Sequence, residues 1–218
     1  MILSLRVLFL SLLGLGGVQA APSLYSTGPD EPTAYVRFVN TAEHSAQLGK
    51  DSVVLAGQSA TAFQPVRAGH PLDGVIMMGA QRLTLQDQPA EGQFLTIVLP
   101  AKQAADSQVS RFLDPVDDFN AAKASVTLYN AATTCSQASL SVQGRDLRLV
   151  QGVVPGKLAR RQINPAQLAL AVACEDGRAP IALPASGLLQ AGERYSVIVY
   201  ESAQSAVQAL WLQDGMQD

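Results

Sequence analysis

The sequence has little of the side-chain chemistry on which most enzymes depend. It contains only two histidines, two cysteines and one tryptophan in 218 residues. His44 and His70 stand in turn-like segments, away from any recognisable catalytic or metal-binding motif. A serine hydrolase needs a nucleophile in a defined turn and a base that accepts its proton, and no G-D-S, G-x-S-x-G or D-x-x-H motif occurs. We therefore expect a protein that is not an enzyme, with no catalytic residues.

The acidic residues do not predict a metal site, and no sequence feature predicts a cofactor. Two pairs of adjacent acidic residues are Asp117 with Asp118 and Glu175 with Asp176. Neighbouring side chains on an extended strand point to opposite faces, so neither pair would converge on one ion. Neither pair resembles a calcium loop, and there is no glycine-rich loop to hold a phosphate. We expect no metal and no cofactor.

Long apolar runs are absent after the first twenty residues. Residues 1–20 carry one positive charge, Arg6, then an apolar run, and end in the small-x-small pattern Val18-Gln19-Ala20. Such a run is too short to cross about 30 Å of hydrocarbon but is typical of a secretory signal peptide. We expect cleavage near Ala20, a periplasmic mature protein and no transmembrane segment in it.

Positive charge is also scarce, and cysteine use is restricted to one half of the chain. Without Arg6 the mature chain has 14 basic and 18 acidic residues, a net charge of −4, so nucleic acid is not an expected partner. In an oxidising compartment Cys135 and Cys174 most simply form a disulfide. Closing a loop of about 40 residues would contribute roughly 4 kcal/mol on the chain-entropy model.

The sequence repeats itself. Residues 34–42 read AYVRFVNTA and residues 124–132 read ASVTLYNAA, while GQFLTIVL at 92–99 resembles GERYSVIVY at 192–200. Short β-branched and apolar runs separated by Gly, Pro, Asp or Gln predict strands, and no segment keeps a helical period. We predict an all-β protein with two tandem small antiparallel β-sandwich domains after the signal peptide, at residues 21–100 and 123–218.

The first strand of each copy has a regular alternation. Ala34, Val36 and Phe38 share one face, and Ala124, Val126 and Leu128 share the equivalent face, which should point into the core. Asn40 and Asn130 follow. A short amide side chain can bond local backbone, so we predict that both asparagines end their strands and start a turn.

Residues 101–122 are interpreted as an acidic and apolar linker. The segment is poor in strand signals but carries large apolar side chains, unlike a purely flexible linker. We expect Phe112, Leu113 and Phe119 to pack on a domain face or to dock a partner.

Five basic residues stand close together in the second copy, which is about ten residues longer than the first between its landmarks. They are Arg145, Arg148, Lys157, Arg160 and Arg161. Arginine binds carboxylates through a two-pronged fork, so these residues could form a surface for an anionic polymer or an acidic partner. The alternative is a solvated strand edge whose charges discourage aggregation.

Several phrases in order resemble one known family. They are LYSTGP at 24–29, AYVRFVN at 34–40, KASVTLYN at 123–130, RQINP at 161–165 and LALAV at 168–172. Together they resemble the AlgF family of alginate O-acetylation accessory proteins. The resemblance implies a periplasmic protein needed to acetylate the mannuronate residues of alginate, working beside a membrane O-acyltransferase and SGNH-like acetyl-handling proteins. It implies no catalytic residues.

Three functions remain as hypotheses. The first is a non-catalytic adaptor whose partners are the periplasmic and membrane proteins of polysaccharide O-acetylation. The second is a carbohydrate-binding module that holds an anionic polysaccharide through the five basic residues. The third is an acetyl carrier or transferase.

Overall fold

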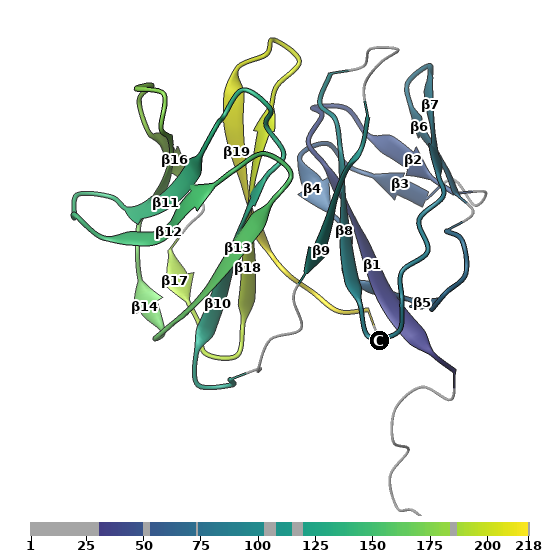
Figure 1. Ribbon diagram of the computed structural model, residues 1–218, viewed down its shortest axis with the longest axis horizontal. Helices are drawn as coiled ribbons and strands as arrows, with labels where there is room; N and C mark the ends of the chain where they lie inside the picture. Colours follow the sequence, from purple (N-terminus) through teal and green to yellow (C-terminus); the bar gives the residue numbers. More distant parts are fainter. Residues whose placement is uncertain are drawn as a thin grey trace, which may run out of the picture. The chain divides into compact units, whose positions relative to one another are not determined.

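The chain forms strands and turns, with no helix in the part of the chain that the structure describes (Figure 1). The computed structural model describes residues 31–49, 53–72, 74–102, 108–114, 120–183 and 187–217. The predicted signal peptide lies outside these residues. The all-β prediction is confirmed, and residues 31–218 cluster as one compact unit.

The first half, residues 31–114, contains two sheets. One has the order β4-β1-β8-β9 with β5 also paired to β1, and the other has the order β3-β2-β6-β7. The strands are β1 (Thr33–Asn40), β2 (Ala46–Leu48), β3 (Val53–Leu55), β4 (Ser59–Ala60), β5 (Gln64–Arg67), β6 (Gly74–Met78), β7 (Gln81–Leu85), β8 (Phe94–Leu99) and β9 (Ser110–Asp114).

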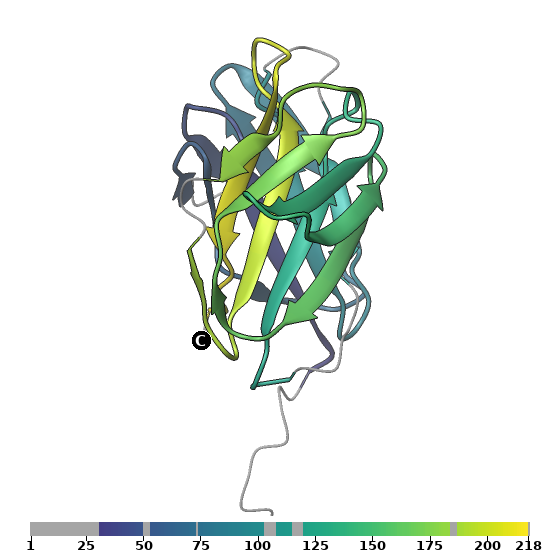
Figure 2. The ribbon, with the colours of Figure 1, turned by 90° about the vertical axis from the view of Figure 1, so that its left-hand side faces the viewer.

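The second half, residues 120–217, repeats this arrangement. Its sheets have the orders β13-β10-β18-β19 and β12-β11-β15-β16, with a short β14-β17 pair added. Figure 2 shows this half nearest the viewer, with its two sheets one behind the other. The strands are β10 (Ala124–Asn130), β11 (Ala138–Val142), β12 (Arg148–Val153), β13 (Leu158–Ile163), β14 (Ala166–Gln167), β15 (Leu170–Cys174), β16 (Ile181–Leu183), β17 (Leu188–Leu189), β18 (Arg194–Glu201) and β19 (Val207–Gln213).

Strand pairing shows that the two halves have the same topology. Both sandwiches are largely antiparallel, but each has one parallel pair at the centre of a sheet, β1 with β8 and β10 with β18. Asn40 lies opposite Leu99 in the first pair, and Asn130 lies opposite Val199 in the second. Parallel neighbours need a long crossover, and here the crossover includes the whole second sheet of each half.

The two asparagines end their strands as predicted. The Nδ2 of Asn40 donates to the carbonyl of His44 at 2.8 Å, and its Oδ1 accepts from the Ala42 amide at 3.1 Å. Asn130 does the same with the Cys135 carbonyl at 2.7 Å and the Ala132 amide at 3.2 Å. Each buried amide therefore satisfies the backbone of the turn that follows it.

Three apolar clusters form the core. One fills each sandwich, and the third contains Val39, Val98, Phe112, Tyr129 and Ile198, from both halves. The sheets that contain β1 and β10 therefore pack against each other. This explains why every residue of β10 is buried, since both of its faces are covered.

The segment interpreted as a linker is in part a strand. Within residues 101–122, Ser110–Asp114 form β9, which pairs with β8 and extends the first half beyond residue 100. Alternation in this strand is masked by its charges: Arg111 and Leu113 are exposed, while Phe112 and Asp114 are buried. Phe119 lies outside the described residues.

The predicted disulfide is present. Cys135 and Cys174 are joined and tie the turn after Asn130 to β15. Such bonds persist in oxidising compartments such as the periplasm or the cell exterior. The described residues form no helix, and therefore none that could cross a membrane.

Candidate functional site

A polar cluster is buried where the two halves meet. At its centre, Arg37 on β1 is only 1% exposed. Its three guanidinium nitrogens donate to four side chains from both halves: Thr96 Oγ1 at 2.9 Å, Asp214 Oδ1 at 2.6 Å, Tyr129 Oη at 3.0 Å and Ser196 Oγ at 2.8 Å. The chain places a charge in the interior but gives it acceptors in every direction, which is what a buried guanidinium requires.

Asp114 is the second centre of this junction cluster. It accepts hydrogen bonds from Tyr129 Oη, from Thr96 Oγ1 at 2.9 Å and from the guanidinium of Arg160 at 3.0 Å. Asp114 belongs to the first half and Arg160 to the second, so this ion pair also crosses the junction.

The cluster follows the duplication of the chain. Thr96 and Ser196 occupy equivalent positions on β8 and β18. The two aspartates are also equivalent: Asp114 is the last residue of β9, and Asp214 directly follows β19. Each aspartate accepts from the hydroxyl of its own half and pairs with an arginine of the other half. Two cations and two anions therefore balance across the junction, although the arginines are not at equivalent positions: Arg37 is on the central strand β1 and Arg160 is on the edge strand β13.

Burial governs the ionisation of the cluster. Burial opposes the charge of Arg37, but Asp214, Tyr129 and Asp114 outweigh this effect and raise the pKa of the guanidinium. Burial raises the pKa of Tyr129. The charge of Arg37 lowers this pKa, but the charges of Asp114 and Asp214 raise it further. Burial also raises the pKa of Asp114, although the bond from Tyr129 and the charge of Arg37 oppose it. These groups are sealed between two sheets, so their arrangement suits holding the halves together rather than meeting a substrate.

The C-terminal segment adds a backbone tie across the junction. The Phe63 amide donates to the Gly215 carbonyl at 2.8 Å, and the Gln217 amide donates to the Phe63 carbonyl at 2.9 Å. The Phe63 ring lies under the Arg37 guanidinium, 4.5 Å from its carbon. The second half thus ends as a short parallel bridge on the first.

The structure does not bring the five basic residues together as one surface. Arg145 lies in the turn before β12, and Lys157 lies in the turn after it, at the opposite end of that strand. Arg148 is on the edge strand β12, and Arg161 is on the edge strand β13; all four are exposed. Arg160 turns to the other face of β13, where it joins the junction cluster.

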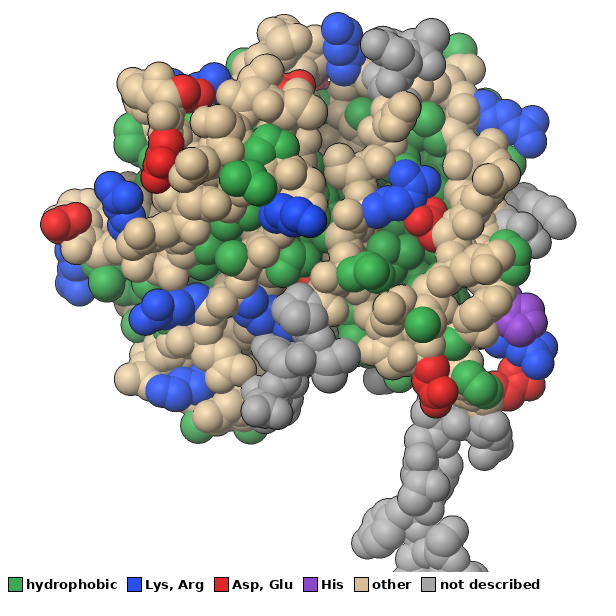
Figure 3. All heavy atoms as spheres, in the orientation of Figure 1, with side chains coloured by type: hydrophobic (Ala, Val, Ile, Leu, Met, Phe, Trp, Pro, Cys, Tyr) green, Lys and Arg blue, Asp and Glu red, His purple; other side chains and the backbone are tan. Residues whose placement is uncertain are grey.

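A groove of about 670 Å³ follows the junction on one side of the described chain. The first half contributes Arg111 and the exposed Leu113, and the second contributes Lys157 and Leu158. The Asp87 carboxylate accepts from Arg111 at 2.6 Å at its edge. In Figure 3, basic and apolar side chains lie side by side along the middle of this face.

Phe112 and Leu113, from the segment interpreted as a linker, have different locations. Phe112 is buried in the junction, with its ring edge-on to Tyr129 at 5.3 Å between centroids. Leu113 is 55% exposed and faces the groove. Phe112 therefore packs on the second half, whereas Leu113 remains available to a partner.

Neither histidine joins a ligand set. His44 and His70 are exposed in turns. Among the residues that the structure describes, no group of three or more His, Cys, Asp or Glu side chains could hold a metal ion.

The junction cluster escaped the sequence analysis, although signals for it exist. An arginine inside an apolar strand, as in residues 34–42, should have marked a buried charge that needs partners. The spacing of 100 residues between Thr96 and Ser196, and again between Asp114 and Asp214, would have supplied them. The apolar pattern of the duplication alone does not reveal these polar partners.

The chain was compared with known proteins. No family model and no curated protein matches it. Two solved structures, of candidate cell adhesion proteins from Bacteroides uniformis and Bacteroides ovatus, are each 12% identical to it, with TM-scores of 0.29 and 0.30. The alignments cover 86% and 85% of this chain and 100% and 98% of theirs. Similarity at this level carries no functional argument.

Proposed function

We propose that this chain is a non-catalytic periplasmic adaptor in the O-acetylation of an exopolysaccharide, with alginate as the polymer that the sequence phrases imply. The observation that carries the proposal is the junction cluster. An adaptor must hold two partner surfaces at a fixed spacing, and buried ion pairs with an apolar surround fix one sandwich on the other.

The groove along the junction is the surface that we assign to a partner. It combines Arg111 and Lys157 with the exposed Leu113, and both halves contribute to it. Interfaces typically place an apolar anchor among polar groups. An acidic partner surface with one apolar side chain would match this groove.

The test is a pull-down of the co-encoded acetylation proteins with the full mature chain, beside polymer acetylation after deletion of its gene. The double variant Leu113→Asp with Lys157→Glu should retain at least tenfold less of the partner protein, because it reverses the charge of the groove and removes its apolar anchor. Arg82→Glu, a charge reversal on the exposed face of β7, is the matched control and should bind normally. Normal acetylation after deletion, with no partner retained, would sink the proposal.

A polysaccharide-binding role is the second candidate, because Arg145, Arg148, Lys157 and Arg161 are all exposed. Titration with oligouronates at low and high salt tests it. Binding through these charges should weaken as salt screens them. A lack of binding at low salt would remove this candidate.

A further inference from the structure

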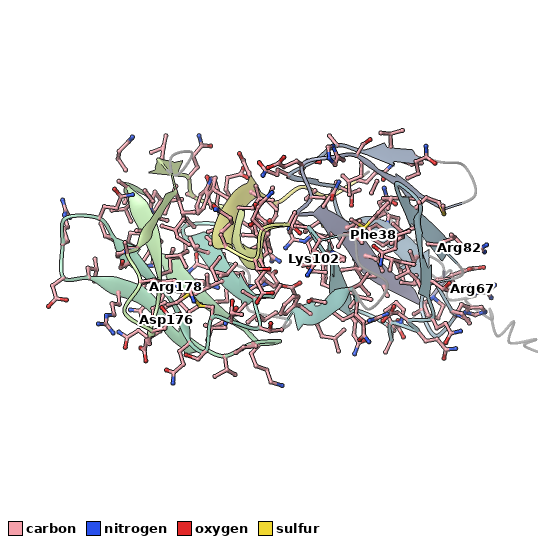
Figure 4. All side chains as sticks on the ribbon, turned by 90° about the horizontal axis from the view of Figure 1, so that it is seen from above. Phe38, Arg67, Arg82, Lys102, Asp176 and Arg178 are labelled. Atoms are coloured by element: carbon pink, nitrogen blue, oxygen red, sulfur yellow. A yellow bond between two sulfur atoms is a disulfide. The ribbon has the colours of Figure 1, made fainter. Side chains whose placement is uncertain are left out.

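A polar cleft lies between the two halves, at the end of the junction where β8 and β18 finish. Its volume is about 390 Å³, within the roughly 300–1,000 Å³ that small-molecule sites occupy. The first half contributes Glu43 and Gln58, and the second contributes Gln204. Figure 4 looks down on this end of the molecule and labels Lys102, which follows the lining residue Ala101, between the halves.

Each wall of the cleft includes a turn with an uncommon backbone conformation. Gln58, with a φ of 50°, and Ser205, with a φ of 61°, are the only non-glycine residues in the described part of the chain whose φ is left-handed. Gln58 lines the cleft, and Ser205 belongs to the β18–β19 hairpin, whose residues 202–204 and 206 line it. This hairpin is the yellow loop at the top of Figure 1. Such strain is concentrated at functional sites, so the two turns favour a binding role for this end of the junction.

Asn40 holds the wall that the first half provides. Its buried Nδ2 donates to the carbonyls of His44 at 2.8 Å and Ala56 at 3.1 Å, which joins the two turns of this wall. The Gln58 amide donates to the Ala42 carbonyl at 2.9 Å and closes the second turn on the first. A wall that is fixed before a ligand arrives loses little conformational entropy on binding.

Tyr200 supplies a buried hydroxyl to the cleft, which it lines while being only 6% exposed. Its hydroxyl oxygen accepts from Gln58 Nε2 at 3.5 Å, a long contact, and no described residue accepts the hydroxyl proton. Burial and then the charge of Glu43 raise the pKa of Tyr200, so the proton is retained at neutral pH. Pro100 occupies the equivalent position in the first half, so the shared fold does not need this hydroxyl. A ligand in the cleft would supply the acceptor that a buried donor requires.

The lining favours an uncharged ligand that is rich in hydroxyl groups. Apart from the Tyr200 ring, the apolar side chains among its described residues are three alanines, which form no pocket for an apolar anchor: Ala101, Ala203 and Ala206. The described lining holds no lysine or arginine, and the carboxylate of Glu43 would repel an anion. Its glutamine amides both donate and accept hydrogen bonds, as the hydroxyl groups of a sugar do. They belong to Gln58, Gln204 and Gln208.

We propose that this cleft binds an uncharged sugar unit of a saccharide, with Tyr200 donating to one sugar oxygen and with Gln58 and Glu43 bonding the neighbouring hydroxyls. The site goes beyond the adaptor function and does not depend on it, because it shares no described lining residue with the partner groove. It also differs from the candidate surface for an anionic polysaccharide, since none of the exposed basic residues of that surface lines it.

Two variants remove ligand contacts and leave the fold intact. Tyr200→Phe deletes only a hydroxyl that makes one long bond. Gln58→Gly deletes the amide side chain, and glycine adopts the left-handed φ of this position without strain. Tyr35→Phe is the matched control, because it deletes the same atom from a ring that stacks on Phe94, outside the described lining of the cleft.

The experiment applies the full mature protein to an array of immobilised oligosaccharides of glucose, galactose, mannose and rhamnose, beside oligouronates. A neutral oligosaccharide should be retained, and calorimetric titration with it measures its dissociation constant. The constant should rise at least fivefold in Tyr200→Phe and in Gln58→Gly, since each loses a hydrogen bond, and should be unchanged in Tyr35→Phe. Tyr200→Phe should keep the wild-type urea midpoint.

Three results would overturn the proposal. One is that no neutral oligosaccharide binds the wild-type protein; retention of oligouronates alone, weakened by salt, would place saccharide binding on the exposed basic residues. Another is that the retained oligosaccharide binds Tyr200→Phe and Gln58→Gly as tightly as the wild type. The third is a urea midpoint for Tyr200→Phe far below that of the wild type, which would show that the hydroxyl joins the two halves instead of meeting a ligand. In each case a pull-down that retains the acetylation proteins would leave the adaptor function standing.

Discussion

Arg37 places a guanidinium between two sheets, and removing it would leave several buried acceptors without a hydrogen-bond donor. Asp214 is its closest anionic partner, at 2.6 Å, and both side chains are largely buried. Breaking a buried ion pair from one side leaves an uncompensated charge, which typically costs about 3–5 kcal/mol. We expect Arg37→Met to lower the free energy of unfolding by about that amount, as measured by urea titration.

Arg178→Met is the control for that variant. Arg178 bonds the carboxylate of Asp176 at 2.7 Å in a turn, where both side chains are partly exposed. Solvent screens an exposed pair, so it contributes little to stability and this variant should unfold near the wild-type midpoint. Equal losses in the two variants would show that the junction cluster does not stabilise the fold.

Glu201 gives a prediction for pH. Burial tends to raise its pKa, but bonds from the Thr134 amide and the Thr133 hydroxyl, both at 2.8 Å, outweigh this and lower it. A lowered pKa in the folded state contributes stability above the ordinary pKa of a glutamate, and this is lost as the pH falls through the folded value. Glu201→Gln should therefore lower the free energy of unfolding by about 0.5–1 kcal/mol at pH 7, and by much less at pH 3. An equal loss at both pH values, measured by urea titration, would contradict this.

At the scale of elements, the disulfide fixes the turn after β10 on β15. The bonded cysteines are 39 residues apart and buried, so alanine at both positions should disturb packing little. Closing a loop of this length contributes about 2–4 kcal/mol. We expect the double variant Cys135→Ala with Cys174→Ala to have a free energy of unfolding lower by that amount, as measured by urea titration.

Reduction supplies the check on this prediction. Dithiothreitol should move the wild-type urea midpoint to that of the double alanine variant and should leave the variant unchanged. A wild-type midpoint that does not respond to complete reduction would show that the bond contributes nothing to stability.

The elements also show where sequence reasoning reached its limit. Apolar alternation predicted the inward face of β1 and β10. Five of its six residues are buried and Phe38 is partly buried against the first core; the five are Ala34, Val36, Ala124, Val126 and Leu128. Alternation did not predict that the other face is buried too, because Arg37 and Tyr129 look like surface residues until their partners are known. For the same reason β9 was read as a linker: Arg111 and Asp114 suggested solvent, but Asp114 is buried by an arginine from 46 residues further on.

The candidate sites divide in the same way. Cysteine pairing followed from composition and compartment alone. The five basic residues are close in sequence but lie on different turns and strands. Arg160 and Arg161 also point to opposite faces, because neighbouring side chains alternate along a strand. The groove depends on strand pairing between distant segments, which one sequence does not specify.

For the whole molecule, the junction determines whether the two sandwiches unfold together. Trp211 is the only tryptophan and stacks on Tyr195 in the second half, with ring centroids 5.1 Å apart. Its fluorescence therefore reports on the second half, whereas far-ultraviolet circular dichroism reports on the strands of both. Because the halves share buried ion pairs and an apolar cluster, we expect both probes to give one coincident urea transition.

Arg37→Met should separate these transitions. The second half keeps its disulfide and, among the described residues, the larger of the two sandwich cores, so it should outlast the first once the junction is weakened. Circular dichroism would then begin to change at a lower urea concentration than Trp211 fluorescence, whereas the Arg178→Met control would keep the two curves superimposed. Separate transitions already present in the wild-type protein would mean that the halves fold independently, and a fixed spacing could then no longer support the adaptor function.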